Sequence, residues 1–144
     1  MDKNIEYSIK EGYNEMDFDK VTEMLAGSYW CEGIQKDEVL QGAQNSALVV
    51  GAFSANNEQI GFARVISDKT RFAYILDIII EEGFKKKGIE QDLTIFILNH
   101  PDLKDVYQWL LISKDARDEY KKVGFKTASH TKSWLEIRLG RPEK

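Results

Sequence analysis

The stretch over residues 76–98, LDIIIEEGFKKKGIEQDLTIFIL, constrains the fold more than any other part of the chain. An apolar run over residues 75–80 predicts a buried strand, and apolar positions 89, 93, 96 and 97 then repeat at helical spacing. Three lysines and a glycine, residues 85–88, lie between the two. Such a turn places unpaired backbone N–H groups and cationic side chains at the start of a helix, an arrangement suited to binding an anion.

Composition limits the class of protein. A chain of 144 residues with 42% hydrophobic and 31% charged residues predicts one folded domain over 1–144. A net charge of −4 argues against a nucleic-acid partner. The single cysteine, Cys31, favours a reducing cytoplasmic location. We expect no signal peptide and no membrane-spanning segment, because no uncharged apolar stretch is long enough.

Periodicity predicts an α+β chain with a mixed sheet. Strands are expected over 5–9, 47–53, 59–66, 72–80 and 106–112, with two more beginning at 125 and covering 134–139. Helices are expected over 17–27, 34–44, 87–99 and 115–123. The strands on either side of the 87–99 helix should run parallel, joined by a right-handed crossover.

This order of elements, with a basic turn after the fourth strand, resembles the GNAT N-acetyltransferases over nearly the whole chain. The family's phosphate-binding signature is Arg/Gln-x-x-Gly-x-Gly/Ala, and residues 85–90 here read Lys-Lys-Lys-Gly-Ile-Glu. A second family pattern, a tyrosine shortly before a Gly-Phe step, matches Tyr120 and Gly124-Phe125. The resemblance implies a three-layer domain with a mixed central sheet flanked by about four helices.

The resemblance also implies an acetyl-CoA-dependent N-acetyltransferase that acts on a small amine or a peptide amino group. Transfer would be direct, within a ternary complex. Tyr120 would protonate the leaving thiolate, and backbone groups of Ile78, Ile79 and Ile80 would pair with the pantetheine arm and the acetyl carbonyl. The pyrophosphate would be held by Lys85, Lys86, Lys87, Gly88, Ile89 and Glu90.

Glu90 departs from the family pattern, because it places a carboxylate where the signature has a small residue. In water, two unit charges about 4 Å apart repel by about 1 kcal/mol, and by about 4 kcal/mol at an intermediate dielectric. An acidic residue in the first turn also stabilises a helix that has no bound anion. These effects keep a second reading open, in which the chain is a catalytically degenerate GNAT-fold binding or regulatory domain. Likewise, the lysines 85–87 could form a solvated turn and Tyr120 could be a packing residue.

The amine acceptor needs a separate site. Tyr29, Trp30 and Tyr74 are candidates for its walls, with core and rim packing as the alternative. Glu81 and Glu82, at the end of the predicted strand, are candidate proton acceptors through water, or simply solvent-facing residues.

The sequence also supports expectations about Asp77, metal binding and assembly. Asp77 lies inside an apolar strand, so it is either a base or, more simply, a structural anchor for backbone N–H groups. We expect no metal, because the sequence has no ligand cluster at metal spacing. Edge strands in the C-terminal half could pair two copies as a homodimer.

Overall fold

One five-stranded sheet organises the chain, and the computed structural model describes residues 5–129 and 131–140 of it. Its strands lie side by side in chain order: β1 (Tyr7–Glu11), β2 (Leu48–Ser54), β3 (Gln59–Ser67), β4 (Phe72–Ile80) and β5 (Gln108–Leu111). Neighbours are antiparallel except β4 and β5, which are parallel and joined through a helical crossover. The mixed sheet predicted from the sequence is therefore confirmed.

Four α-helices flank the sheet: α1 (Phe18–Ala26), α2 (Lys36–Gln44), α3 (Ile89–Leu98) and α4 (Arg117–Lys121). Short 3-10 turns occupy Tyr13–Glu15, Glu82–Phe84, Pro101–Leu103 and Thr131–Ser133. The sequence explains the start of α1, because the Asp17 side chain accepts a hydrogen bond from the Lys20 N–H as an N-cap. Phe18, Val21 and Leu25 then repeat along one buried face of this helix.

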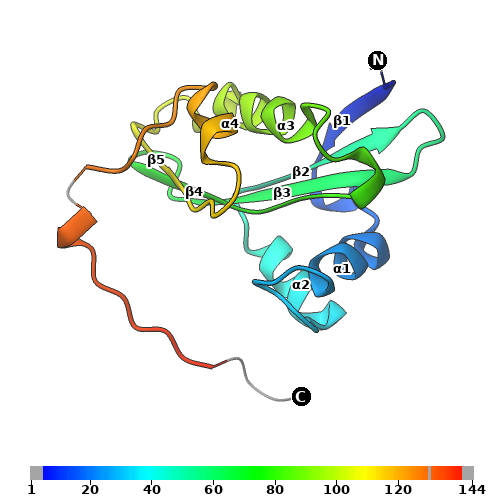
Figure 1. Ribbon diagram of the computed structural model, residues 1–144, viewed down its shortest axis with the longest axis horizontal. Helices are drawn as coiled ribbons and strands as arrows, with labels where there is room; N and C mark the ends of the chain where they lie inside the picture. The colour runs from blue at the N-terminus through cyan, green and yellow to red at the C-terminus, as the bar shows by residue number, and fades with distance from the viewer. Residues whose placement is uncertain (1–4, 130, 141–144) are drawn as a thin grey trace.

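The molecule has three layers (Figure 1), with α1 and α2 on one face of the sheet and α3 and α4 on the other. Each face has its own apolar core. Under α3 the largest buried side chains include Ile75, Leu93 and Ile97. Under α1 and α2 the largest buried side chains include Val21, Leu25 and Phe62. The strand β4 contributes to both cores, which explains its nearly continuous apolar sequence.

The start of α3 lies two residues later than predicted. Gly88 has φ +85°, in the left-handed region that glycine adopts without strain, so the helix begins at Ile89 rather than at residue 87. The basic turn therefore contains all three lysines.

The predicted strands at 125 and 134–139 are absent. Residues 126–129 and 131–140 are exposed, and a 3-10 turn is the only regular element in them. Apolar and polar residues do alternate over 134–139, but no strand in the described residues pairs with this segment. Periodicity reports which face of a strand would be apolar, not whether a partner is present. The predicted single domain covers residues 1–144, of which 1–4, 130 and 141–144 lie outside the described ranges.

Candidate functional site

The strands β4 and β5 separate halfway along β4. Their pairing runs from Phe72 opposite Gln108 to Ile75 opposite Leu111, whereas β4 continues to Ile80. On its other edge β4 remains paired with β3 as far as Ile80. Among the described residues, therefore, residues 76–80 have a neighbouring strand on one side only; they include the predicted cofactor contacts Ile78, Ile79 and Ile80. Their free edge can pair with an extended ligand, as an added strand would.

A β-bulge lies at the point where the strands separate. Leu76 pairs with Arg64 and Ile79 with Phe62, so two residues of β4 oppose one of β3. Asp77 lies in the bulge and has φ +56°, a left-handed conformation that is uncommon for residues other than glycine. The bulge re-aims the backbone groups of β4 beside the open edge.

The basic turn follows β4 after one 3-10 turn. Lys86 has φ +65° and Gly88 has φ +85°, and no side chain caps α3. The first N–H groups of the helix are consequently available to an anion. All three lysines are exposed, and Lys85 makes an ion pair with Glu82 at 2.9 Å. The turn thus has the backbone form and the charge that a phosphate group requires.

Glu90 is half-buried in the first turn of α3, on the side that faces α4. Burial raises the pKa of Glu90, the nearby Glu119 carboxylate adds to that rise, and Lys85 opposes it. The two helices are also joined by a hydrogen bond of 2.6 Å from Gln91 Nε2 to Glu119 Oε1. Glu90 therefore belongs to the contact between α3 and α4, where burial and the Glu119 carboxylate disfavour its ionised form.

Tyr120 is the buried residue of α4, with 6% of its surface exposed. Its ring meets Phe125 edge to face at 6.4 Å between centroids. Burial, and secondarily the Glu90 carboxylate, raises the pKa of Tyr120 well above its ordinary value of 10.0. Within the described residues no hydrogen bond engages its hydroxyl. A protonated hydroxyl without a protein acceptor has the chemistry of a general acid.

On the opposite face of the sheet, a cavity of about 450 Å³ lies between the helices α1 and α2 and the strands β3 and β4. Its lining is mainly apolar and includes Leu25, Cys31, Ile34, Val39, Phe62, Ile66 and Leu76, with Arg64 and Asp77 among its polar groups. It contacts β4 at the bulge, through Leu76 and Asp77.

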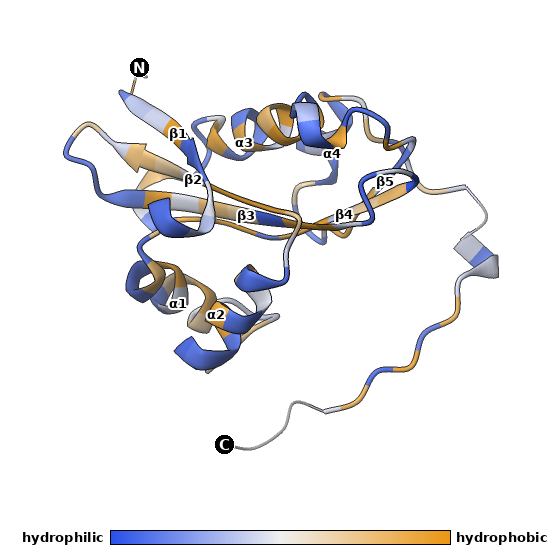
Figure 2. Cartoon of the chain, turned by 180° about the vertical axis from the view of Figure 1, so that it is seen from behind, coloured by the Kyte–Doolittle hydropathy of each residue, from blue (hydrophilic) through white to orange (hydrophobic). Residues whose placement is uncertain are grey.

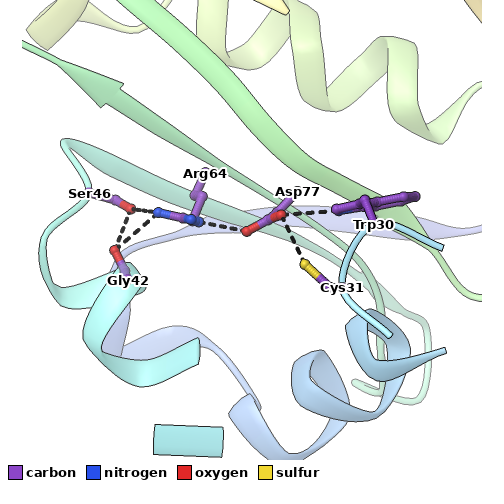
Figure 3. A network of polar contacts seen from close by, with 6 residues as sticks. All are labelled: Trp30, Cys31, Gly42, Ser46, Arg64 and Asp77. Atoms are coloured by element: carbon purple, nitrogen blue, oxygen red, sulfur yellow. Dashed lines mark hydrogen bonds and ion pairs between the residues drawn. The ribbon is translucent and has the colours of Figure 1, made fainter. Parts of the chain in front are cut away.

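Asp77 anchors a polar network at this cavity (Figure 3). Its Oδ2 accepts from Arg64 Nε at 2.7 Å, and its Oδ1 accepts from Trp30 Nε1 at 3.2 Å. Arg64 Nη1 in turn donates to the carbonyl of Gly42 and to Ser46 Oγ, each at 3.3 Å. The network ties α2, β3, β4 and the loop after α1 together. Asp77 is thus an anchor, but for side chains rather than for the backbone N–H groups expected from the sequence.

The three predicted wall residues have different environments. Trp30 is 42% exposed but held by Asp77, and Tyr29 is 63% exposed with the Lys114 ammonium 4.9 Å from its ring centroid. That contact brings the loop after α1 to the segment after β5. Tyr74 is half-buried on β4, and burial raises its pKa. None of the three is among the residues that line the cavity.

The candidate proton acceptors are both in ion pairs. Glu81 pairs with Lys20 of α1, and Glu82 pairs with Lys85 in the basic turn. Neither carboxylate lines the cavity. Sequence reasoning missed Arg64 and Gly42, although a signal was present. Arg64 lies two residues from both Phe62 and Ile66, so its side chain is on the same face of the strand as theirs. It therefore places a charge on an otherwise apolar face.

Solved structures with the same architecture decide the fold. A protein of the GNAT family from Xanthomonas campestris pv. campestris superposes with a TM-score of 0.84 at 26% identity, covering 93% of this chain and 94% of its own. This chain has the GNAT N-acetyltransferase fold. No protein-family model and no curated protein sequence matches it.

Two further GNAT-fold matches are more distant and show the fold alone. Glucosamine-6-phosphate N-acetyltransferase from Arabidopsis thaliana has a TM-score of 0.67 at 14% identity, covering 95% of this chain and 98% of its own. A protein from Clostridium acetobutylicum, described as a predicted acetyltransferase and solved with acetyl-CoA, has a TM-score of 0.65 at 18% identity, covering 92% and 96%. The likeness to the Xanthomonas campestris protein, at 26% identity, supports acetyl transfer at the level of the GNAT family.

Two features are absent from the described residues. No group of three or more His, Cys, Asp or Glu side chains among residues 5–129 and 131–140 is placed to hold a metal ion. None of the helices in those ranges is both long enough and apolar enough to cross a membrane.

Proposed function

We propose that this protein is an acetyl-CoA-dependent N-acetyltransferase that acts on a small amine or a peptide amino group, by direct transfer in a ternary complex. The observation that carries the proposal is the free edge of β4 over residues 76–80. It lies between an uncapped basic turn on one side and a cavity on the other. A donor and an acceptor could therefore approach the bulge at Asp77 from opposite faces of the sheet.

The residues present suit acetyl-CoA. The backbone of Ile78, Ile79 and Ile80 would pair with the amide-containing pantetheine arm along the free edge. The turn from Lys85 to Glu90 would hold the pyrophosphate, with Gly88 allowing the left-handed backbone that exposes the first N–H groups of α3. Acetyl-CoA, when bound, supplies an activated acetyl group. Glu90 weakens this binding, because its carboxylate lies in the same first turn.

Tyr120 is the proposed general acid. Its hydroxyl is protonated at neutral pH and can pass a proton to a departing thiolate, although burial raises its pKa and makes it a weaker acid. The hydroxyl has no acceptor among the described residues, which leaves that proton available.

The acceptor amine would enter from the cavity between α1, α2 and the sheet. Its mainly apolar lining favours an amine carried on an apolar body. Tyr29, Trp30 and Tyr74 are proposed to wall the approach to it. Glu81 and Glu82 are the proposed proton acceptors, acting through water after release from Lys20 and Lys85. We place the reaction in the cytoplasm, where the lone Cys31 stays reduced.

Calorimetric titration with acetyl-CoA at moderate salt, followed by a thiol-release assay on a panel of amines, tests the proposal. We expect binding, and CoA release that depends on an apolar primary amine. Absence of binding at millimolar acetyl-CoA would overturn the enzyme assignment.

A second function has one observation in its favour. Glu90 and Glu119 place two carboxylates beside the start of α3, where a pyrophosphate would bind. This charge favours a binding or regulatory domain with weak affinity for CoA. Binding of acetyl-CoA without acetyl transfer to any amine of the panel would support this function over catalysis.

A further inference from the structure

The loop between α1 and α2 reaches both sides of the split between β4 and β5. Its two aromatic residues divide this task. Trp30 Nε1 donates to Asp77 Oδ1 at the bulge of β4, at 3.2 Å, as Figure 3 shows. The Tyr29 ring meets the ammonium of Lys114, which belongs to the segment after β5. Figures 1 and 2 view the molecule from opposite sides, and both show α1, α2 and their loop on one face of the sheet. The aromatic pair therefore lies on that face, beside the place where the strands separate.

Tyr29 and Trp30 form a corner with two accessible aromatic faces. Their ring centroids are 5.0 Å apart, and the ring planes meet at 79°. Both side chains are exposed, so a ligand can reach either ring. The face of an aromatic ring attracts a cation through the ring quadrupole, most strongly for tryptophan. Two such faces at nearly a right angle suit an ammonium group better than a single ring does.

A cation already lies on this corner. Lys114 Nζ is 4.9 Å from the centroid of the Tyr29 ring, within the distance of about 6 Å at which a ring attracts a cation. Residues 5–129 and 131–140 provide no carboxylate that forms an ion pair with Lys114. The ring is therefore the contact that places the ammonium, and the corner has the chemistry of a cation site.

The corner is held in place by hydrogen bonds at the base of the loop. Ser28 Oγ donates to the carbonyl of Leu25 at 2.7 Å and accepts from the Cys31 N–H at 3.1 Å. The Gly33 N–H donates to the carbonyl of Ala26 at 3.1 Å. The lysine on the tyrosine ring, in contrast, is exposed and has a flexible four-carbon stem. A ligand can thus displace the lysine without rearranging the aromatic pair, which lowers the cost of binding.

We propose that Tyr29 and Trp30 form a binding site for the charged end of an alkylammonium ligand, and that the Lys114 ammonium competes with that ligand within the chain. The class of ligand follows from the lining. Two aromatic faces bind an ammonium that carries methyl or methylene groups through both its charge and its apolar surface. The site is distinct from the cavity under α1 and α2, because neither aromatic residue lines that cavity.

The consequence for the acceptor rests on the proposed function. A nitrogen that attacks a thioester must first lose its proton, so the reacting nitrogen is not the cation held by the rings. The aromatic site would hold a second nitrogen of the acceptor, which stays charged while the first reaches the bulge at Asp77. This arrangement favours a diamine over a monoamine of the same length.

Choline is the probe for the site, because its quaternary nitrogen cannot lose a proton or accept an acetyl group. Neohexyl alcohol has the same shape without the charge and is the matched control ligand. Both are titrated into the full chain without acetyl-CoA. The Trp30 indole N–H reports binding in a proton–nitrogen correlation spectrum, where the variant Trp30→Phe identifies its signal.

Three variants and two controls separate the parts of the site. Tyr29→Leu removes the ring, Tyr29→Phe keeps it, and Lys114→Met removes the competing charge. The controls are Tyr107→Leu and Lys104→Met. Both control residues are exposed and precede β5, whereas Lys114 follows that strand.

We expect choline to bind saturably in the millimolar range and neohexyl alcohol to bind far more weakly. Tyr29→Leu should weaken choline binding by about fivefold or more, and Tyr29→Phe by less than about twofold. Lys114→Met should tighten it by about threefold, because an intramolecular competitor is removed. The two controls should bind as the unaltered chain does. In an acetyl-transfer assay, cadaverine should have a lower KM than hexylamine, and Tyr29→Leu should abolish the difference.

Several results would overturn the proposal. Equal binding of choline and neohexyl alcohol, or no saturable binding of either, would show that the corner is not a cation site. Unchanged choline affinity in Tyr29→Leu would exclude the ring, and unchanged affinity in Lys114→Met would exclude the lysine as a competitor. Equal KM values for cadaverine and hexylamine would exclude the site from acceptor binding. Because choline binding requires no catalysis, a lack of transfer to every amine would count against the proposed function alone.

Discussion

Arg64 and Asp77 form a salt bridge between neighbouring strands at the base of the cavity, with Nε and Oδ2 separated by 2.7 Å. Their side chains are 19% and 11% exposed, so the pair is largely removed from water. The same carboxylate accepts from Trp30, and the same guanidinium donates to Gly42 of α2. A single pair therefore connects the bulge in β4 to the two segments that enclose the cavity.

Removing one member of this pair should be costly. Arg64→Met leaves the Asp77 carboxylate largely buried without its cation, and breaking such a pair typically costs about 3–5 kcal/mol. We expect the free energy of unfolding, measured in urea, to fall by about 3 kcal/mol. The double variant with Asp77→Asn should lose less than the sum of the single losses, because no charge is left uncompensated.

The ion pair between Lys36 and Asp19 provides a matched control. Its atoms are also 2.7 Å apart, but the side chains are 50% and 83% exposed. Asp19→Asn should leave the free energy of unfolding nearly unchanged, because water screens this exposed pair. Equal losses at the two sites would show that burial does not set the strength of the Arg64–Asp77 contact.

The strands and helices around the basic turn could be predicted from sequence because there local pattern and tertiary burial agree. The apolar run of β4 is buried on both faces, and the periodic positions of α3 face the core. The bulge at Asp77 could not be predicted, since it depends on pairing with β3 rather than on local propensity. The position of Arg64 on the apolar face of β3 could be predicted from its spacing to Phe62 and Ile66. Its partner Asp77 becomes evident only when β3 and β4 are paired.

The C-terminal residues show the opposite situation. Leu135, Ile137 and Leu139 alternate with polar residues as in a strand, yet no strand among the described residues pairs with this segment. Strand formation needs a neighbouring backbone, and the alternation of residues in a segment does not show whether one is present. The roles of Glu81 and Glu82 were equally hard to predict, because their lysine partners depend on side-chain geometry in the turn and against α1.

The charge of Glu90 should reduce stability as pH rises. Burial and Glu119 raise its folded-state pKa above the ordinary value of 4.5, so the folded state holds this proton more tightly than the unfolded state. Stability is then highest below pH 4.5 for this group and is lost as pH rises through the folded-state pKa. Glu90→Gln should remove that loss. Thermal melts at several pH values should show a smaller decline for Glu90→Gln than for the exposed substitution Glu23→Gln on α1.

Glu90→Gln should also tighten the binding of acetyl-CoA. A carboxylate in the first turn of α3 opposes a bound pyrophosphate by about 1–4 kcal/mol, depending on the dielectric. We expect the dissociation constant measured by calorimetry to fall about tenfold or more. An unchanged affinity would show that the side chain does not face the phosphates.

Tyr120→Phe should affect the rate and little else. The hydroxyl makes no hydrogen bond with another described residue, so its removal should change stability by less than about 0.5 kcal/mol. Loss of a positioned general acid typically lowers turnover by about 10²–10⁴. We expect acetyl-CoA affinity to be nearly unchanged in calorimetry while the steady-state rate falls. A normal rate with an active amine would leave Tyr120 as a packing residue against Phe125.

The conformation of Gly88 should matter more than its size. Its φ of +85° is strained for any residue with a Cβ, and a Cβ would lie 3.4 Å from Gln91 Oε1. Gly88→Ala should therefore cost about 1–2 kcal/mol of stability and weaken acetyl-CoA binding by reshaping the N–H groups at the start of α3. Gly83 in the same connection is the control, because its φ is not positive and no described atom lies within 4 Å of the position that a Cβ would take. Gly83→Ala should leave both the melting temperature and the calorimetric affinity nearly unchanged. Equal loss of affinity in the two variants would mean that the turn does not bind through its left-handed backbone.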